Sequence, residues 1–254
     1  MIPKIIHWCW LSTDLIPENL NTCMISWDRY LPEYKKIHWN FSRFNIDDSI
    51  WVKEAFQTKK YAFAADYIRL FALYNYGGFY LDMDVEVIKS FDQFLKLPIV
   101  LCWQKDIGGL EVAAFGVQPH SPIIKLCLDR YNNRHFIIND GKLDTKTLPK
   151  IVEDTLLENG YKLINVNNIN EALDIKDPYN IPVFPSEFFS PKSYLSGRIN
   201  ITSNTFCIHH FAGSWLPQYM RFEIKFWNLI GVKNLNIIHK IINALTKLKI
   251  IKYF

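Results

Sequence analysis

The stretch that most restricts the fold is residues 59–87, where a helix, two glycines and a buried strand follow one another without a break. Residues 59–78 read KKYAFAADYIRLFALYNYGG, which is rich in Ala and Leu, so the sequence predicts a helix that stops at the glycine pair. The next residues, FYLDMDVEVI, begin with apolar and aromatic side chains that do not alternate with polar ones. This pattern is typical of a strand that is buried on both faces.

Strands and helices are expected to alternate along the rest of the chain. Apolar, β-rich stretches predict strands at residues 3–10, 34–41, 97–103, 112–118, 161–166 and 204–211. Helical spacing predicts helices at residues 17–32, 46–57, 121–132 and 145–159, and the polar stretch 164–182 reads as a long loop region. We therefore expect an α/β fold with a mostly parallel sheet, in which ligands bind beyond the carboxyl ends of the strands.

Length, charge and cysteine usage restrict the class of protein. A chain of 254 residues with 49% apolar residues can form one α/β domain with a sizeable core and an appendage. No run of 18 uncharged apolar residues and no signal-peptide pattern is present, which predicts a cytoplasmic protein. The five cysteines are scattered and form no CxxC pair, so we expect reduced thiols. Nucleic acid is not an expected partner, because residues 1–215 carry 22 basic and 24 acidic side chains.

Two aspartates, Asp82 and Asp84, follow the apolar start of the strand. On an extended strand they point the same way, and a divalent cation is the economical way to offset their repulsion. The alternative is that the strand ends at Leu81 and leaves both acids solvated. Upstream, Asp66 and Arg69 share one helix face and could hold sugar hydroxyls and a diphosphate, or could only pair with each other.

The stretch AFAADYIRLFALYNYGGFYLDMDVEV resembles the core motif of DXD-containing sugar transferases of glycosyltransferase family 32. It is more distantly similar to the glucosyltransferase domains of large clostridial toxins. The opening IPKIIHWCW and the later IHHFAGSW resemble the first strand and the closing motif of the same family. The resemblance implies a GT-A type, Rossmann-like nucleotide-sugar-binding domain, a donor that is preferably a UDP-sugar, Mn²⁺ or Mg²⁺ as cofactor, and transfer with retention at the anomeric carbon.

The resemblance also implies a role for individual residues. The catalytic group would be Asp66, Arg69, Asp82 and Asp84. The donor would be contacted by Cys9, Trp10, Asp66, Arg69, Tyr80, Asp82, Ser214 and Trp215, with Trp10 stacked on the base. The metal would be held by Asp84 and His210, and His209 is the alternative because neighbouring strand residues point to opposite faces. One departure is Ala65, where many relatives have serine, so one hydroxyl contact to the donor is missing.

The same residues also allow other interpretations of the function. On its own, Trp10 would be a packing residue. A DxD phosphohydrolase of the haloacid-dehalogenase type would use Asp82 as nucleophile, although Glu86 stands where that family places Thr or Val. A catalytically inactive adaptor that binds sugar nucleotides or membranes is the third reading. Asp106 or Glu111 is expected to face the acceptor.

Two domains are expected, a GT-A transferase domain at 1–215 and a basic amphipathic helical tail at 216–254. From Leu216 onward there are seven Lys and Arg against one acid. Apolar residues at helical spacing in 234–254 predict a helix that either packs on the domain or lies on an anionic membrane surface. The membrane reading suits a glycan or polyprenol-linked acceptor in bacterial surface or capsular polysaccharide synthesis, at the inner face of the plasma membrane.

The membrane reading predicts that deletion of residues 234–254 removes binding to vesicles that contain an anionic lipid. Each lysine near an anionic surface contributes about 1 kcal/mol to such binding. Sedimentation with vesicles measures the effect, and vesicles of neutral lipid alone serve as the control. Equal sedimentation of the full and shortened chains would contradict this reading.

Overall fold

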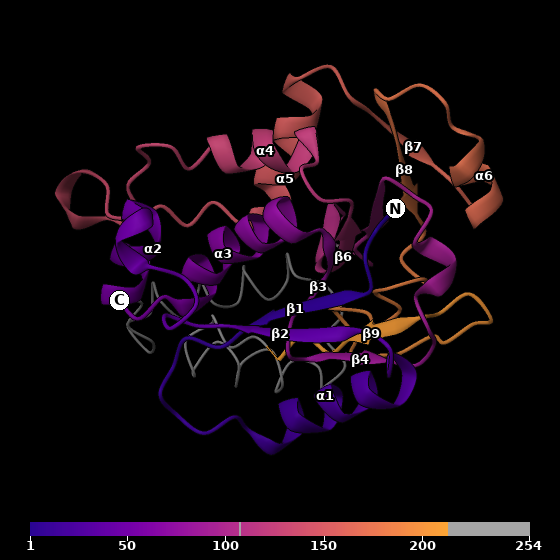
Figure 1. Ribbon diagram of the computed structural model, residues 1–254, viewed down its shortest axis with the longest axis horizontal. Coiled ribbons are helices and arrows are strands. Elements are labelled where there is room, and N and C mark those ends of the chain that lie inside the picture. The colour runs from indigo at the N-terminus through magenta and orange to yellow at the C-terminus, as the bar shows by residue number, and fades with distance from the viewer. Residues whose placement is uncertain (107, 213–254) are drawn as a thin grey trace, which may run out of the picture.

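The computed structural model describes residues 1–106 and 108–212 as a mixed seven-stranded sheet beside a smaller two-stranded sheet (Figure 1). The strands are β1 (Ile5–Cys9), β2 (Lys35–Trp39), β3 (Gly78–Leu81), β4 (Val85–Val87), β5 (Ile99–Trp103), β6 (Leu110–Val117), β7 (Lys162–Asn165), β8 (Asn180–Phe184) and β9 (Cys207–His209). The α-helices are α1 (Glu18–Tyr30), α2 (Ile50–Gln57), α3 (Tyr61–Tyr76), α4 (Pro122–Asp129), α5 (Leu148–Glu158) and α6 (Ile169–Asp174).

The large sheet has the strand order β2-β1-β3-β6-β5-β8-β7, and β4 pairs with β9 in the small sheet. Strand β6 is antiparallel to both of its neighbours, whereas the other neighbouring pairs in the large sheet are parallel. Helices α2 to α5 lie on one side of the sheet, and α1 lies with β4 and β9 on the other (Figure 1). The predicted α/β fold with a mostly parallel sheet is therefore confirmed.

Two apolar clusters occupy the two faces of the sheet. One contains Trp39, Trp51 and Phe115 and packs with α2 to α5, and the other contains Trp27 and Phe94. Burial on both faces explains why β3 and β6 carry nearly continuous apolar sequence. Among the described residues, no helix is long and apolar enough to cross a bilayer.

Two sequence predictions are wrong in detail. Residues 79–88 do not form one strand, because the chain turns after β3, with Val85 N donating to Asp82 O at 3.0 Å. The stretch 164–182, expected to be a loop, contains α6 and the beginning of β8. Its polar residues form the cap of that helix, since Asn168 accepts from the Glu171 N–H at 3.0 Å. The predicted tail at 216–254 lies outside the described residues.

The glycine pair joins α3 to β3 as expected. Gly77 has φ +60°, and the helix ends there, with the Gly77 N–H donating to Leu73 O at 2.9 Å. Gly78 has φ +100°, and a Cβ there would lie 2.6 Å from Ile5 O on the neighbouring strand. The close approach of β1 to β3 therefore requires a residue without a side chain.

His7 is a buried histidine whose two ring nitrogens are both used. Its Nε2–H donates to Gly77 O at 2.8 Å, and its Nδ1 accepts from the indole N–H of Trp39 at 3.0 Å. A second ring proton would face the indole proton. Burial, partly opposed by the Gly77 hydrogen bond, lowers the pKa of His7 to about 4.

We predict that His7 makes stability fall in mild acid. Between pH 6.5 and pH 4 the unfolded chain binds a proton at His7 that the folded chain does not, so the free energy of unfolding falls as pH falls. The slope from this residue is at most about 1.4 kcal/mol per pH unit. Urea unfolding of the protein and of His7→Gln at pH 7.5 and pH 5 measures it. A variant with the same pH slope as the parent would contradict the assignment.

Candidate active site

The turn after β3 places Asp82 and Asp84 at the carboxyl end of a central strand. The Asp82 N–H donates to Ala113 O at 2.7 Å, which continues the pairing with β6 for one residue. Asp84 Oδ2 accepts the N–H of Ala212 at 2.7 Å. The strand does end at Leu81, as the alternative reading expected. The acids are nevertheless not freely solvated, because their side chains are 31% and 13% exposed.

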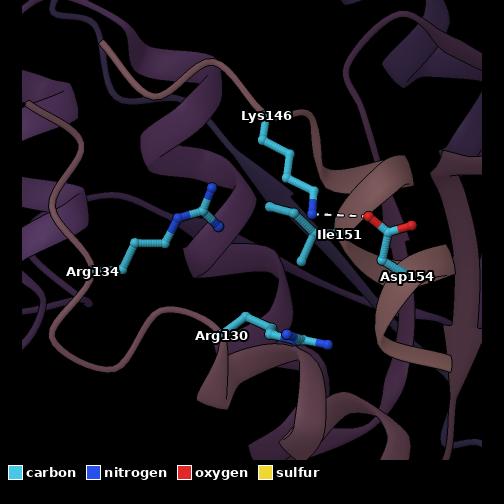
Figure 2. Close-up of a pocket in the computed structure, with 5 residues that line it drawn as sticks. All are labelled: Arg130, Arg134, Lys146, Ile151 and Asp154. Carbon is cyan, nitrogen blue, oxygen red and sulfur yellow. Dashed lines mark ion pairs between the residues drawn. The ribbon is translucent and has the colours of Figure 1, made fainter. Parts of the chain in front are cut away.

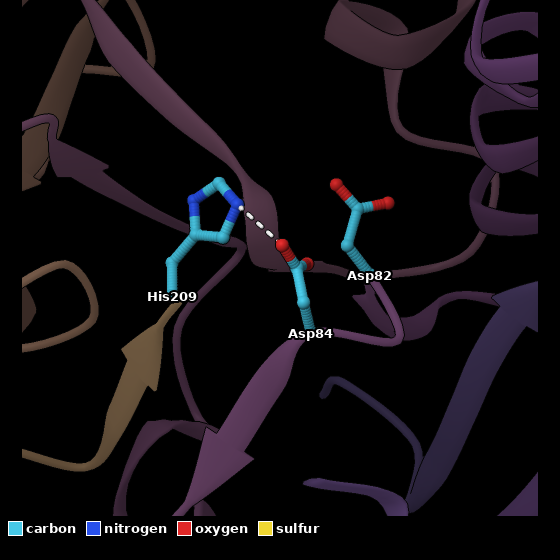
Figure 3. A group of neighbouring side chains, drawn as sticks. All are labelled: Asp82, Asp84 and His209. Atoms are coloured by element: carbon cyan, nitrogen blue, oxygen red, sulfur yellow. Dashed lines mark ion pairs between the residues drawn. The ribbon is translucent and has the colours of Figure 1, made fainter. Parts of the chain in front are cut away.

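His209 of β9 joins the two aspartates (Figure 3). One ligand atom each from Asp82, Asp84 and His209 lie within 4.8 Å of one another, and His209 Nε2 is 3.5 Å from Asp84 Oδ2. His210, which the sequence favoured for the metal, instead donates from Nε2 to Glu86 at 2.8 Å. Adjacent side chains on a strand point to opposite faces, so only His209 reaches the group.

The charges around the aspartates differ in their effect on each carboxyl. Burial alone would raise the pKa of Asp84, but His209 and the Ala212 N–H hold it at about 2. Burial raises the pKa of Asp82. The positive charge of Arg69 lowers this pKa, and the negative charge of Asp84 raises it further. Asp84 is therefore the more firmly ionised of the pair and the better ligand for a cation.

Arg69 is the central cation of the site. Its side chain is 6% exposed, and its Nη2 lies 3.2 Å from Oδ1 of both Asp66 and Asp82. Its Nη1 donates to Val112 O at 2.8 Å, and the guanidinium lies 4.4 Å from the ring centroid of Tyr80. Its Nε–H has no hydrogen-bond partner among the described residues. Arg69 and Asp66 therefore do pair, but in a buried network that includes Asp82.

Asp66 and Tyr80 lie close to this guanidinium. Burial raises the pKa of Asp66 to about 7, against the effect of Arg69. Tyr80, which the sequence grouped with the donor contacts, is 1% exposed on β3, and its ring lies against the guanidinium of Arg69.

The end of β1 lies beside the end of β3. His7 pairs with Tyr80, and continuing this register puts Cys9 next to Asp82. The half-buried Trp10 follows, with its indole N–H donating to Asp14 O at 3.0 Å. The segment predicted to contact the base therefore borders the aspartates. The other predicted donor residues, Ser214 and Trp215, lie outside the described residues.

Glu111 is a site residue whose contacts the sequence did not reveal. Either Asp106 or Glu111 was expected to face the acceptor. Glu111 is 3% exposed, and its Oε2 accepts from His209 Nδ1 at 3.0 Å. The available signal was a lone acid at the start of the apolar strand LEVAAFGV. An ionised carboxylate in such a strand needs a cationic or hydrogen-bonding partner.

A separate hollow of about 210 Å³ lies beside α5 (Figure 2). It is lined by Arg130, Arg134, Lys146, Ile151 and Asp154. Each of its basic residues is already paired with an acid, as Lys146 is with Asp154 at 2.8 Å. The hollow shares no lining residue with the aspartate group and does not by itself indicate an anionic ligand.

Comparisons with known proteins agree with this site. Residues 12–98 match the family model described as "Glycosyltransferase sugar-binding region containing DXD motif". The chain is 34% identical over 134 residues to inositol phosphoceramide mannosyltransferase 2 of Schizosaccharomyces pombe, covering 50% of this chain and 38% of that protein. It is 31% identical over 143 residues to the mannosyl phosphorylinositol ceramide synthase SUR1 of Saccharomyces cerevisiae, covering 54% and 37%.

The chain thus spans less than two fifths of the length of these two curated relatives. Among solved structures, the PaToxG glycosyltransferase is similar with a TM-score of 0.46 and 18% identity, over 62% of this chain and 70% of that one. The family match includes the Asp66–Arg69 pair and both aspartates of the turn. Residues 12–98 of this chain are therefore similar to the glycosyltransferase sugar-binding regions that contain a DXD motif.

Proposed function

We propose that this protein is a metal-dependent glycosyltransferase that moves a sugar from a nucleotide-sugar donor to an acceptor. The observation that carries the proposal is the convergence of Asp82, Asp84 and His209 within 4.8 Å, next to a buried Arg69. The family match over residues 12–98 supports a donor sugar as the molecule bound there.

The residues present fit a hard divalent cation such as Mn²⁺ or Mg²⁺. Asp84 and His209 would hold it, with Asp82 as a further oxygen ligand, because carboxylate oxygens and imidazole suit such ions. When bound, the ion supplies positive charge where the diphosphate becomes more negative. His210 stays a second candidate ligand, although Glu86 occupies its Nε2 here.

The chain's own residues would orient the donor sugar and its phosphates. The bond between the anomeric carbon and a diphosphate oxygen breaks, so negative charge grows on the leaving group. Arg69 would act from behind Asp66 and Asp82, where its positive charge offsets the negative charge that grows on the leaving group. Asp66 and Asp82 would accept hydrogen bonds from sugar hydroxyls. Retention of configuration is part of the proposal, with a leaving phosphate oxygen accepting the acceptor's proton.

The sugar and the acceptor are proposed from the relatives' names. One is named an inositol phosphoceramide mannosyltransferase and another a mannosyl phosphorylinositol ceramide synthase, which supports a mannosyl group and an acceptor that carries a lipid. A polyprenol-linked glycan shares that chemistry. We also propose a preference for UDP, a role in bacterial surface polysaccharide synthesis and a location at the inner face of the plasma membrane.

The phosphohydrolase alternative has less support. A nucleophilic Asp82 would attack a phosphorus atom with one carboxylate oxygen. Oδ1 of Asp82 is paired with Arg69 at 3.2 Å, which leaves Oδ2 for that role. The family match, however, concerns sugar-binding regions rather than hydrolases. The inactive adaptor is distinguished only by an activity assay.

We predict that donor binding depends on Mn²⁺ or Mg²⁺ and that Asp84→Asn removes this dependence. The substitution keeps the size of the side chain and an oxygen for the Ala212 N–H, but it removes the charge that attracts the cation. Thermal shift with a panel of UDP- and GDP-sugars, each with and without metal, measures it. The same panel identifies the base, and GDP-mannose and UDP-hexoses are its most informative members.

Glu86→Gln is the matched control, because it makes the same chemical change two residues away at a carboxylate that pairs with His210. His209→Ala and His210→Ala separate the two histidines, and only the first is expected to weaken the metal effect. An Asp84→Asn variant with full metal-dependent transfer would defeat the site assignment. A larger loss in His210→Ala than in His209→Ala would restore the sequence-based ligand.

We predict that Arg69→Lys lowers transfer about 100-fold while the protein stays folded. Lysine keeps the charge but cannot bridge Asp66, Asp82 and Val112 O as the planar guanidinium does. Initial transfer rates and thermal midpoints measure the two effects. Arg134→Lys is the matched control, since Arg134 also contacts a carboxylate and stacks 4.4 Å from an aromatic ring. Equal loss of transfer in both variants would contradict a specific role for Arg69.

A further inference from the structure

Glu111 lies in the central strand of the large sheet and contacts His209. We call Asp82, Asp84 and His209 the metal group. Glu111 is in β6, opposite Cys102 of β5, at a point where the pairing register shifts after Val100. Glu111 is only 3% exposed, so neither solvent nor a substrate contacts it directly. The position is one that an apolar side chain would normally occupy.

The two carboxylate oxygens of Glu111 have different partners. Oε1 accepts the N–H of Ala113, two residues along the same strand, at 2.8 Å. Oε2 accepts from His209 Nδ1 at 3.0 Å. The first contact holds the carboxylate against its own strand, and the second directs it across to β9. Glu111 therefore connects the large sheet to the small one through a single side chain.

These contacts restrict the ring of His209. Because a carboxylate oxygen only accepts, Nδ1 of His209 must carry the proton of this hydrogen bond. The other nitrogen, Nε2, then faces Asp84, with 3.5 Å between Nε2 and Oδ2. On its side the ring meets Phe211, with 4.0 Å between ring centroids. The ring is thus held by Glu111 at Nδ1, and Nε2 is directed toward Asp82 and Asp84.

We propose that Glu111 is a positioning residue that fixes the orientation and tautomer of His209 for binding of the divalent cation. This inference rests on the proposed metal-dependent function. It explains why an acid is buried in the apolar strand β6, where an apolar residue of similar size would normally stabilise the fold at least as well. A carboxylate behind a metal-binding histidine typically changes metal affinity by roughly 10- to 100-fold.

The test uses the full chain and Mn²⁺ as the probe, without any sugar nucleotide. Free Mn²⁺ is measured by electron paramagnetic resonance during titration of the protein, of Glu111→Gln and of Glu54→Gln. Glu54 is the matched control, because it also accepts from a histidine Nδ1, that of His135, at 2.7 Å, and from the N–H of Phe136 at 2.8 Å. It makes none of the contacts of the metal group.

The expected result is that Glu111→Gln weakens Mn²⁺ binding roughly 10- to 100-fold, whereas Glu54→Gln binds as the parent does. In a His209→Ala background, Glu111→Gln should cause no further loss, because Glu111 acts through that ring. Equal Mn²⁺ affinity in Glu111→Gln and the parent would overturn the proposal. So would an undiminished further loss in the His209→Ala background.

Two further outcomes are informative. If Glu111→Gln does not fold, Glu111→Asp keeps the charge but draws the carboxylate back from Nδ1. Weaker Mn²⁺ binding is again expected, and unchanged binding would overturn the proposal. A parent protein that transfers sugar and binds Mn²⁺ while Glu111 variants bind it equally would refute this inference alone. A parent protein that binds neither Mn²⁺ nor Mg²⁺ would refute it together with the proposed metal dependence.

Discussion

The buried guanidinium of Arg69 is the interaction on which the site depends. It reaches Asp66 of its own helix, Asp82 after β3 and the carbonyl of Val112 in β6. Three elements are thereby tied together by one cation that stays charged at any working pH. Without it, two partly buried acids would lie near each other with little to offset their repulsion. The aromatic face of Tyr80 completes its surroundings.

The small sheet is the second feature that brings the site residues together. Strand β4 follows the DXD turn directly, and β9 comes from more than a hundred residues later in the chain. Their pairing is continued by His210 N, which donates to Asp84 O at 2.9 Å, and by Ala212 N, which donates to the Asp84 side chain. The backbone after β9 thus fixes Asp84, while His209 approaches from the same strand. A cation site built in this way requires the two segments to be docked correctly.

Two histidines of this chain show how environment decides chemistry. His7 accepts an indole proton in the core, and burial lowers its pKa, so it remains a neutral packing residue. At His209, burial would also lower the pKa, but Glu111 and Asp84 outweigh it and raise the pKa well above the usual value. Only the second environment attracts positive charge. The residue type is the same, and the acids placed around it make the difference.

Much of the fold could be predicted because its signals are local. The α3 helix, the glycine pair and the apolar β3 are contiguous in sequence, and Asp66, Arg69, Asp82 and Asp84 all lie within residues 66–84. The helix α6 was missed although its Asn168 cap is also local, because polar composition was taken to mean a loop. The break between β3 and β4 was missed because a strand that leaves one sheet for another keeps its apolar sequence on both sides.

The sequence by itself determined most of the order of strands and helices, apart from α6, β8 and the break between β3 and β4. It also determined the presence of paired acids beside an arginine, since spacing and composition encode both. Only the tertiary structure decided which histidine joins those acids and that Glu111 stands behind it. The physical reason is that these contacts cross from β6 to β9, where the orientation of each side chain depends on strand register and sheet pairing.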